Sequence, residues 1–244
     1  MDATAKLREV LRQAEQTNQQ NHNHEPVFGK VVDYDAATDS LLTLNLTKQN
    51  TELTTAIVSD AAKFSQWVDG QLKQHHCRYG IGGYMEYRSI YIGIPLLETA
   101  HEPRLLHLGV DNWGGAGTPV YAPLDGTIHS FADNNHHGDY GPTIILQHSL
   151  NGLTFYSLYG HLSRANLTGL QTGMPIKRGQ AIANLGTADE NGHWPPHLHF
   201  QLMLNMQGNT GDYPGACRIS EKEKYLMNIA DPGLILGFAD AINA

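Results

Sequence analysis

From about residue 80 onward, the chain is a series of short apolar runs separated by glycine, proline and Asp-Gly or Asn-Gly pairs. Runs of this length with turn residues between them are typical of β-strands joined by tight turns. The clearest example flanks Asn151-Gly152, a pair that suits a two-residue hairpin turn with positive φ at both positions. The 25 glycines of the 244-residue chain agree with a turn-rich structure. We therefore predict a mainly β fold with a compact antiparallel sheet or barrel-like core.

The N-terminal part of the chain has a different pattern. Residues 3–19 have the apolar spacing of an amphipathic helix, and a polar stretch that contains His22 and His24 follows as a linker. No apolar strand surrounds these two histidines, so they carry little weight as ligands. We predict that residues 1–80 are an N-terminal helix with a small α+β appendage, packed on or near the core. Residues 81–244 then form the main domain, with its core at about 105–204 and a C-terminal extension.

Charge and hydropathy exclude some partners. The formal net charge is −8, from 24 acidic and 16 basic residues, which argues against nucleic acid or an anionic surface as the main ligand. No segment has the apolar length of a signal-peptide core or of a membrane span. We expect a cytoplasmic protein without a membrane partner, in which Cys77 and Cys217 are reduced thiols or small core residues rather than a disulfide. The oligomeric state stays open.

The sequence "PPHLHFQLM" alternates polar and apolar residues after Pro196. This period of two predicts a half-buried strand in which His197 and His199 share one face. Two surface histidines on an exposed strand face are the simpler interpretation. The pair points to a site only if further ligands exist.

Candidates for those ligands are His107 and Asp111, whose spacing of four puts both on one side of a strand or a helix. A catalytic zinc site needs three protein ligands and one open position, and one histidine of the HxH would complete the set. An aspartate beside glycines can instead cap a turn. His161 follows the second strand of the predicted hairpin, where it could face a groove or remain a surface histidine.

Five segments, "HLGVD", "AGTPVYAPLDGTI", "LYGHLS", "IKRGQAIANLG" and "PPHLHF", resemble in that order the lysostaphin-like, or LytM-type, zinc metallopeptidases. The resemblance covers about residues 105–204 and implies a core of the duplicated hybrid motif type. It also implies that Zn²⁺ is bound by His107, Asp111 and His199, and that His161 and His197 are catalytic.

The expected function is zinc-dependent hydrolysis of peptide or amide bonds, with a peptide or small amide as substrate. Zinc in such a site lowers the pKa of its bound water towards about 7 and polarises the scissile carbonyl. His161 and His197 would accept the proton of that water or donate hydrogen bonds to the oxyanion, and which does which stays open. One alternative is a non-catalytic zinc-binding or regulatory module.

Departures from the family favour another alternative, a zinc hydrolase of a small cytoplasmic metabolite. Gln201 stands where family members often have Glu, and the loop before the HxH reads "TADENGHWPP". The chain past residue 205 resembles the stretch that follows a similar peptidase-like domain in large fused proteins, where it sits between a small-molecule kinase-like domain and an aminotransferase-like domain.

Several other residues carry weaker expectations. His193 and Trp194 are expected to wall the groove, although Trp194 could equally be a packed loop anchor. His101 and His148 are expected to lie at the surface. A loop cluster, expected to contact substrate rather than metal, is formed by His129, His136, His137 and Asp139.

Overall fold

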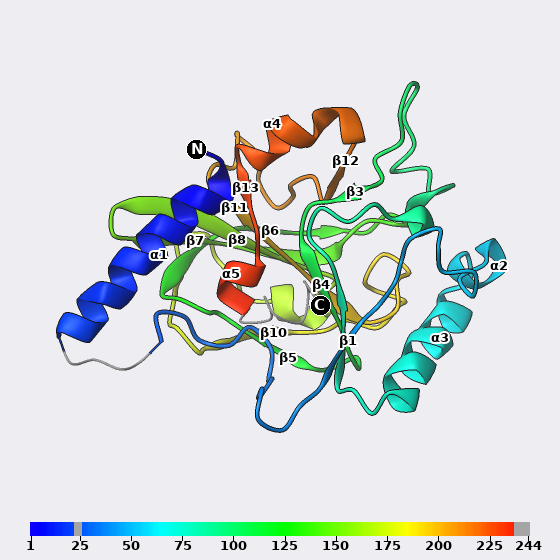
Figure 1. Cartoon of the computed structure of the whole chain (residues 1–244), viewed down its shortest axis with the longest axis horizontal. Helices are drawn as coiled ribbons and strands as arrows, with labels where there is room; N and C mark the ends of the chain where they lie inside the picture. Colours follow the sequence, from blue (N-terminus) through cyan, green and yellow to red (C-terminus); the bar gives the residue numbers. More distant parts are fainter. Residues whose placement is uncertain (22–25, 237–244) are drawn as a thin grey trace.

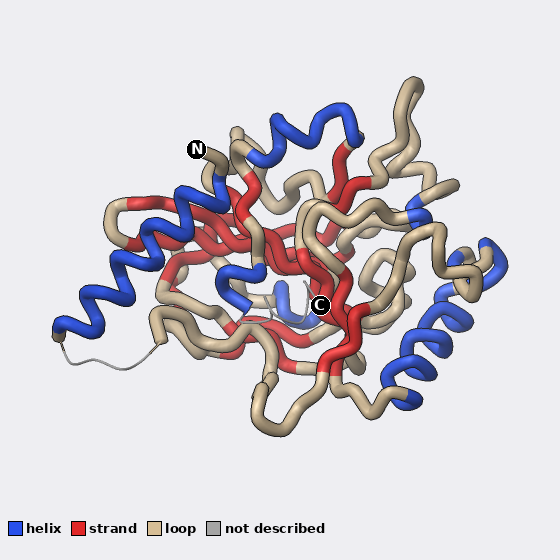
Figure 2. The backbone as a smooth tube through the Cα atoms, in the orientation of Figure 1, coloured by secondary structure: helices blue, strands red, loops and turns tan. Residues whose placement is uncertain are grey.

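The computed structural model describes residues 1–21 and 26–236, so His22 and His24 lie outside the described residues. One 9-stranded sheet dominates the fold, and helices lie around it (Figures 1 and 2). The order of strands in this sheet is β1-β2-β4-β11-β8-β7-β6-β9, with β13 paired to β11. The strands of the sheet are β1 (Leu41–Thr43), β2 (Tyr79–Gly82), β4 (Val110–Trp113), β6 (Gly126–Asn134), β7 (Gly141–Leu150), β8 (Leu153–Gly160), β9 (Pro175–Ile176), β11 (His197–Met203) and β13 (Ile229–Ala230). Two small two-stranded sheets are formed by β5 (Pro119–Tyr121) with β10 (Ala181–Asn184), and by β3 (Leu106–His107) with β12 (Ala216–Cys217).

The large sheet is open. All its strand pairs are antiparallel except β1 with β2. Its path begins at β1 and ends at β9, and over the described residues these two edges do not pair with each other. The prediction of a mainly β, antiparallel fold is therefore confirmed, whereas the sheet does not close into a barrel.

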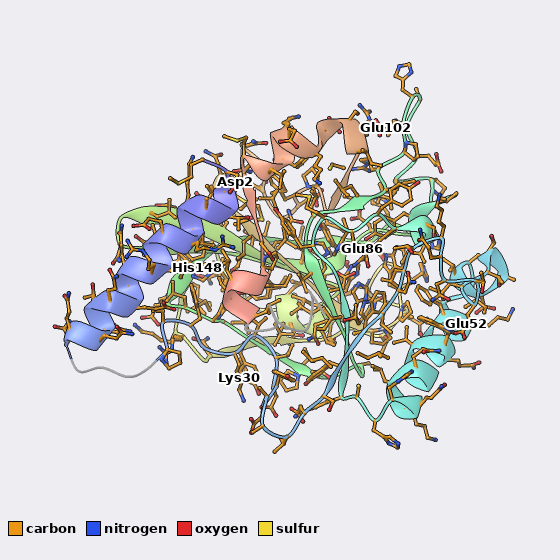
Figure 3. All side chains as sticks on the ribbon, viewed as in Figure 1. Asp2, Lys30, Glu52, Glu86, Glu102 and His148 are labelled. Atoms are coloured by element: carbon orange, nitrogen blue, oxygen red, sulfur yellow. The ribbon has the colours of Figure 1, made fainter. Side chains whose placement is uncertain are left out.

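The hairpin of β7 and β8 turns at the predicted pair. Asn151 and Gly152 have φ of 48° and 80°, and Leu150 pairs with Leu153. His148 lies on β7, but it is only 1% exposed, so the expectation of a surface histidine is wrong. The ring nitrogens of His148, which Figure 3 labels, lie 2.7 Å from Ser157 Oγ and 3.0 Å from the Asp125 carbonyl. Because β7 lies between β6 and β8 and also contacts α1 (Ala3–Gln20), this histidine is covered rather than exposed.

The N-terminal part of the chain joins the same body. Asp2 caps α1 by accepting a hydrogen bond from the Ala5 amide at 2.7 Å, and the helix buries Leu7 in the main core. Figure 1 shows this blue helix alongside β13, a pair that is also in contact in the structure. The strands β1 and β2 extend the large sheet beyond β4, and the boundary predicted at residue 80 falls inside β2.

A second cluster of apolar side chains supports the side of the molecule that carries β4 and the loop before β11. The helix α3 (Ala61–Gln74) buries Phe64, whose ring centroid lies 5.8 Å from that of Trp113 and 6.5 Å from that of Trp194. Glu52, labelled in Figure 3, accepts a hydrogen bond from Trp67 of α3, which packs partly buried against this cluster. The remaining helices are α2 (Thr55–Val58), α4 (Lys222–Leu226) and α5 (Gly233–Leu236). Within the described residues, no helix has the length and apolar character to cross a membrane.

Candidate metal centre

The strand β11 brings the predicted residues together, because two of its neighbours supply partners on the same face. His199 pairs with Asp111 of β4 and with Gly160 of β8, and His197 pairs with Trp113. Residues directly opposite each other in an antiparallel pair project to the same side of the sheet. His161 follows β8 at once, with φ of 61°, an uncommon conformation for a residue other than glycine.

Burial of β11 differs from the prediction. All seven residues of the strand are buried, with His197 and His199 only 2% and 3% exposed. The apolar face packs in the main core, as expected, while side chains from residues 88–104 and 212–216 lie over the polar face. The alternation in the sequence therefore separates two buried environments, not a buried face from a solvent face.

Three of the predicted residues converge on one point. The ring atom Nε2 of His107 lies 2.9 Å from Nδ1 of His199, and Asp111 Oδ1 lies 3.2 Å and 3.1 Å from these two atoms. Ligand atoms on a tetrahedral zinc at 2.0–2.1 Å are about 3.3 Å apart. The three side chains thus have the types and spacing of a zinc ligand set, and this is the one such group found among the described residues.

Hydrogen bonds on the far side of each ring strengthen this assignment. The Nδ1–H of His107 donates to the Gly83 carbonyl at 2.9 Å, and the Nε2–H of His199 donates to Gln201 Oε1 at 3.0 Å. The Gln201 amide is itself oriented, because its Nε2 donates to the Pro214 carbonyl at 3.2 Å. In these tautomers both imidazoles direct a lone pair at the same point as the carboxylate oxygen. A cation between them would stabilise three acceptors that face one another in a buried site, so the residues fit a divalent metal.

The two remaining histidines lie beside this group. His197 donates from Nδ1 to the Pro195 carbonyl at 2.7 Å, and His161 donates from Nδ1 to the Asn191 carbonyl at 2.8 Å. Their rings lie 4.0 Å apart between centroids, and Nε2 of His197 is 3.8 Å from Asp111 Oδ2. Each ring therefore keeps Nε2 available as a proton acceptor next to the candidate metal position.

Burial sets the charge state of these groups. It lowers the pKa of His197 to about 4, and together with the positive charge of Arg88 it lowers the pKa of His107 to about 3. Burial and the neighbouring His197 lower the pKa of His161 well below its usual value. Burial alone would raise the pKa of Asp111, but Arg88 and the histidines lower it well below its usual value. At neutral pH these three imidazoles are therefore neutral and the aspartate is ionised, which are the states that bind a metal.

Sequence reasoning missed the residue that takes the other carboxylate oxygen. Arg88, 1% exposed, donates from Nη1 to Asp111 Oδ2 and to the Tyr91 hydroxyl, and from Nε to Glu86. Figure 3 labels Glu86, which lies close to β4. The arginine lies 23 residues before Asp111, outside the segments that resemble the family, and no local pattern points to it. Arg88 leaves only Oδ1 of Asp111 free to bind a metal.

A pocket of about 110 Å³ opens onto the site, lined by Asp111, His161, His197 and His199. Trp194 also lines it and packs its ring 5.9 Å from that of Tyr91, so it is both a wall of the groove and a packed loop anchor. Tyr140 is a second lining residue that the sequence did not reveal, and its hydroxyl lies 3.4 Å from His199 Nε2. Burial raises the pKa of Tyr140 well above its usual value, so the hydroxyl keeps its proton.

The loop cluster, by contrast, forms no metal group within the described chain, and His129 lies on β6 rather than in the loop that was predicted for it. Asp139 lines the pocket of the site, while His137 and the exposed His193 border a neighbouring pocket that also contacts Trp194. The ring centroids of these two histidines are 5.4 Å apart. Whether they contact substrate stays a prediction.

Residues 105–210 match the model of Peptidase family M23. A curated relative, the peptidoglycan DD-endopeptidase ShyC of Vibrio cholerae serotype O1, is 32% identical over 122 residues, which are 48% of this chain and 25% of that protein. A Haemophilus influenzae protein named as an uncharacterized metalloprotease is 36% identical over 100 residues, 41% of this chain and 19% of the relative. The solved catalytic domain of the antimicrobial peptidase lysostaphin from Staphylococcus simulans matches 66% of this chain and 97% of its own, at 28% identity and a TM-score of 0.39. The chain thus spans a quarter or less of the length of these two curated relatives.

Proposed function

We propose, from the premise that residues 105–210 form a domain of peptidase family M23, that this protein is a zinc-dependent hydrolase of peptide or amide bonds. The observation that carries the proposal is the arrangement of His107, Asp111 and His199, which direct two imidazole lone pairs and one carboxylate oxygen at a single buried point. These residues would hold a zinc ion with three protein ligands, as catalytic zinc sites do, and the pocket beside them could admit water or substrate.

Zinc held by these residues would lower the pKa of a water molecule and polarise the scissile carbonyl. The chain supplies the proton transfers. His161 and His197 line the pocket and are neutral, and because a backbone carbonyl fixes Nδ1–H of each ring, Nε2 is the atom that can accept a proton. The protonated hydroxyl of Tyr140 lines the same pocket and can donate a hydrogen bond to the developing oxyanion.

Metal analysis of the purified protein tests the first half of this proposal. We expect about one zinc per chain, lost in His107→Ala and in His199→Ala. The matched control is His101→Ala, because His101 is exposed and lies outside the site. A protein that takes up no zinc would overturn the proposal.

Turnover tests the second half. Removal of a positioned proton-transfer group typically costs about 10²–10⁴-fold in rate, so His161→Ala and His197→Ala should keep zinc and lose most of kcat. If the wild type binds zinc but cleaves nothing, the protein is instead a non-catalytic zinc-binding or regulatory module.

For the substrate we propose peptides, with peptidoglycan fragments as the first class to test, because two curated relatives are named peptidoglycan DD-endopeptidases. The second candidate is a small amide or a small metabolite, and the size of the pocket favours it. About 110 Å³ is small beside the roughly 300–1,000 Å³ of ligand pockets that enclose drug-sized molecules. A panel of cell-wall fragments, glycine-rich peptides and amino-acid amides, each assayed with and without zinc, separates the two.

A further inference from the structure

Arg88 is the first of two buried side chains at the site that keep an unpaired donor. Hydrogen bonds to Glu86, Tyr91 and Asp111 fix its guanidinium in one orientation. Its remaining nitrogen, Nη2, is buried and has no hydrogen-bond partner in the described part of the chain. Arg88 lines the pocket of the proposed active site.

Trp113 presents a second donor of the same kind. Its Nε1–H is buried, and it too lacks a partner among residues 1–21 and 26–236. The indole stacks on the ring of His197, at 4.0 Å between centroids and 15° between planes, and it lines the same pocket. Trp113 is thus in direct contact with a proposed catalytic histidine.

The two unpaired donors lie next to each other. Both Nη2 of Arg88 and Nε1 of Trp113 lie within 3.3 Å of the position that a Cβ on Gly82 would occupy. Any side chain there would clash with the guanidinium, so glycine at this position of β2 lets the arginine lie beside the indole. The close approach of the two donors is therefore built into the sheet.

Unpaired buried donors are costly, at about 1–3 kcal/mol each, and native proteins rarely keep two side by side without a ligand. The group that matches two adjacent N–H donors, one of them charged, is a carboxylate, since it has two acceptor oxygens and no donor. The sum of the charges at the site also favours a carboxylate. With a divalent cation on Asp111, the charges of the cation, of the buried Arg88 and Asp111 and of the partly buried Glu86 would leave one net positive charge, which a single carboxylate neutralises.

We propose that Nη2 of Arg88 and Nε1 of Trp113 bind a carboxylate of the substrate. The contacts of these two residues with Asp111 and with His197 place that carboxylate about one residue from the scissile amide, since consecutive Cα atoms are about 3.8 Å apart. The substrate class is then a peptide or acyl amino acid with a free carboxylate next to the bond that is cut. This role in substrate selection rests on the proposed hydrolase function, whereas binding of the carboxylate can be measured without turnover.

Indole N–H resonances of the zinc-loaded full chain provide the measurement. The chain has three tryptophans, and the Trp113 resonance is the one lost in Trp113→Phe. We expect N-acetylalanine to shift this resonance downfield and saturably, and N-acetylalaninamide to leave it in place. The Trp67 indole, which donates to Glu52 at 2.9 Å, is the internal control and should not move.

Two variants sharpen the test. Loss of one donor to a charged acceptor should weaken binding of N-acetylalanine about ten-fold in Trp113→Phe, while Trp67→Phe should bind as the wild type does. Arg88→Lys keeps the charge but loses the second donor, and it should weaken binding as well. Unchanged affinity in Trp113→Phe would mean that the carboxylate binds the metal alone, and this result would overturn the proposal, as would equal shifts with the amide.

Failure of the proposed hydrolase function can be told apart from failure of the proposed carboxylate site. If the protein binds zinc and shows the Trp113 shift but cleaves nothing, the carboxylate site is supported and the hydrolase function is not. If the protein takes up no zinc, titration of the metal-free form decides the matter: a saturable Trp113 shift supports the carboxylate site, and its absence overturns it.

Discussion

Each of the four histidines at the site is held in one tautomer by an oxygen atom of the chain. Three of these oxygens are backbone carbonyls, and the fourth is Oε1 of Gln201. The sequence identified all four histidines through their motifs, but it did not show the carbonyl partners Gly83 and Asn191, because the positions of these carbonyls depend on the path of distant loops. Arg88 and Trp113 were missed for a similar reason, since the side chains that position them, Asp111 and Phe64, come from other segments of the chain.

Substitution of Gln201 tests whether a hydrogen bond to the far side of a histidine ring strengthens metal binding. It accepts the Nε2–H of His199, so Gln201→Leu should leave that donor unpaired and weaken zinc binding about 10–100-fold. Gln201→Glu keeps an acceptor at the same position and should retain tight binding. Competition with a chromogenic chelator measures both affinities. Equal affinities for Gln201→Leu and the wild type would contradict the role assigned to this hydrogen bond.

The buried imidazoles also make stability depend on pH. Their pKa values are lower in the folded protein, about 4 for His197 and about 3 for His107, than the usual 6.5, so the unfolded chain binds more protons below pH 6.5. The free energy of unfolding of the metal-free protein should therefore fall as the pH drops from 6.5 towards 4. Each such imidazole contributes a slope of up to about 1.4 kcal/mol per pH unit.

Urea unfolding at a series of pH values measures this slope. His197→Asn should flatten it by the contribution of one imidazole, and His101→Ala, in an exposed position, should leave it unchanged. A slope in His197→Asn equal to that of the wild type would show that this histidine is not neutral and buried in the folded protein.

At the scale of single elements, the local pattern predicted type and position well where its period is clear. The helix α1, the hairpin of β7 and β8, and the strand β11 all form where their periodicity indicates. The burial of β11 was not predictable in the same way. Its polar face is covered by residues that approach from both sides of the sequence, and alternation reports only that the two faces differ.

Two glycines provide a matched test of backbone conformation. A Cβ on Gly70 of α3 or on Gly152 of the hairpin would meet nothing within 4 Å, so the two sites differ in φ and not in packing. Gly152 has φ of 80°, and Gly152→Ala should destabilise the protein by about 1–2 kcal/mol. Gly70→Ala lies inside a helix and should stabilise it by about 0.5–1 kcal/mol. Thermal unfolding gives both signs, and a shift in the same direction for both variants would contradict this account.

At the scale of the whole molecule, the sequence suggested two parts that the structure joins in one sheet. The strands β1 and β2 come from before or around residue 80, yet β2 pairs with β4 next to Asp111. Pairing between segments that are distant in the sequence leaves no local pattern, which is why the chain up to residue 80 could be described only as an appendage. In the structure this part of the chain also supplies Phe64, which packs on the two tryptophans of the site.

Shared packing predicts a single unfolding transition for the described chain. Leu7 of α1 is fully buried in the same core as the apolar residues of β11, so Leu7→Ala should destabilise the whole molecule by about 2–5 kcal/mol. The control is Arg8→Ala, one position along the same helix and exposed. Urea unfolding followed by far-UV circular dichroism and by tryptophan fluorescence should give one coincident transition that Leu7→Ala moves and Arg8→Ala does not. Two of the three tryptophans, Trp113 and Trp194, report on the site, and α1 lies on another part of the sheet. Two separate transitions, or a Leu7→Ala effect seen only by circular dichroism, would therefore show that α1 folds independently of the site.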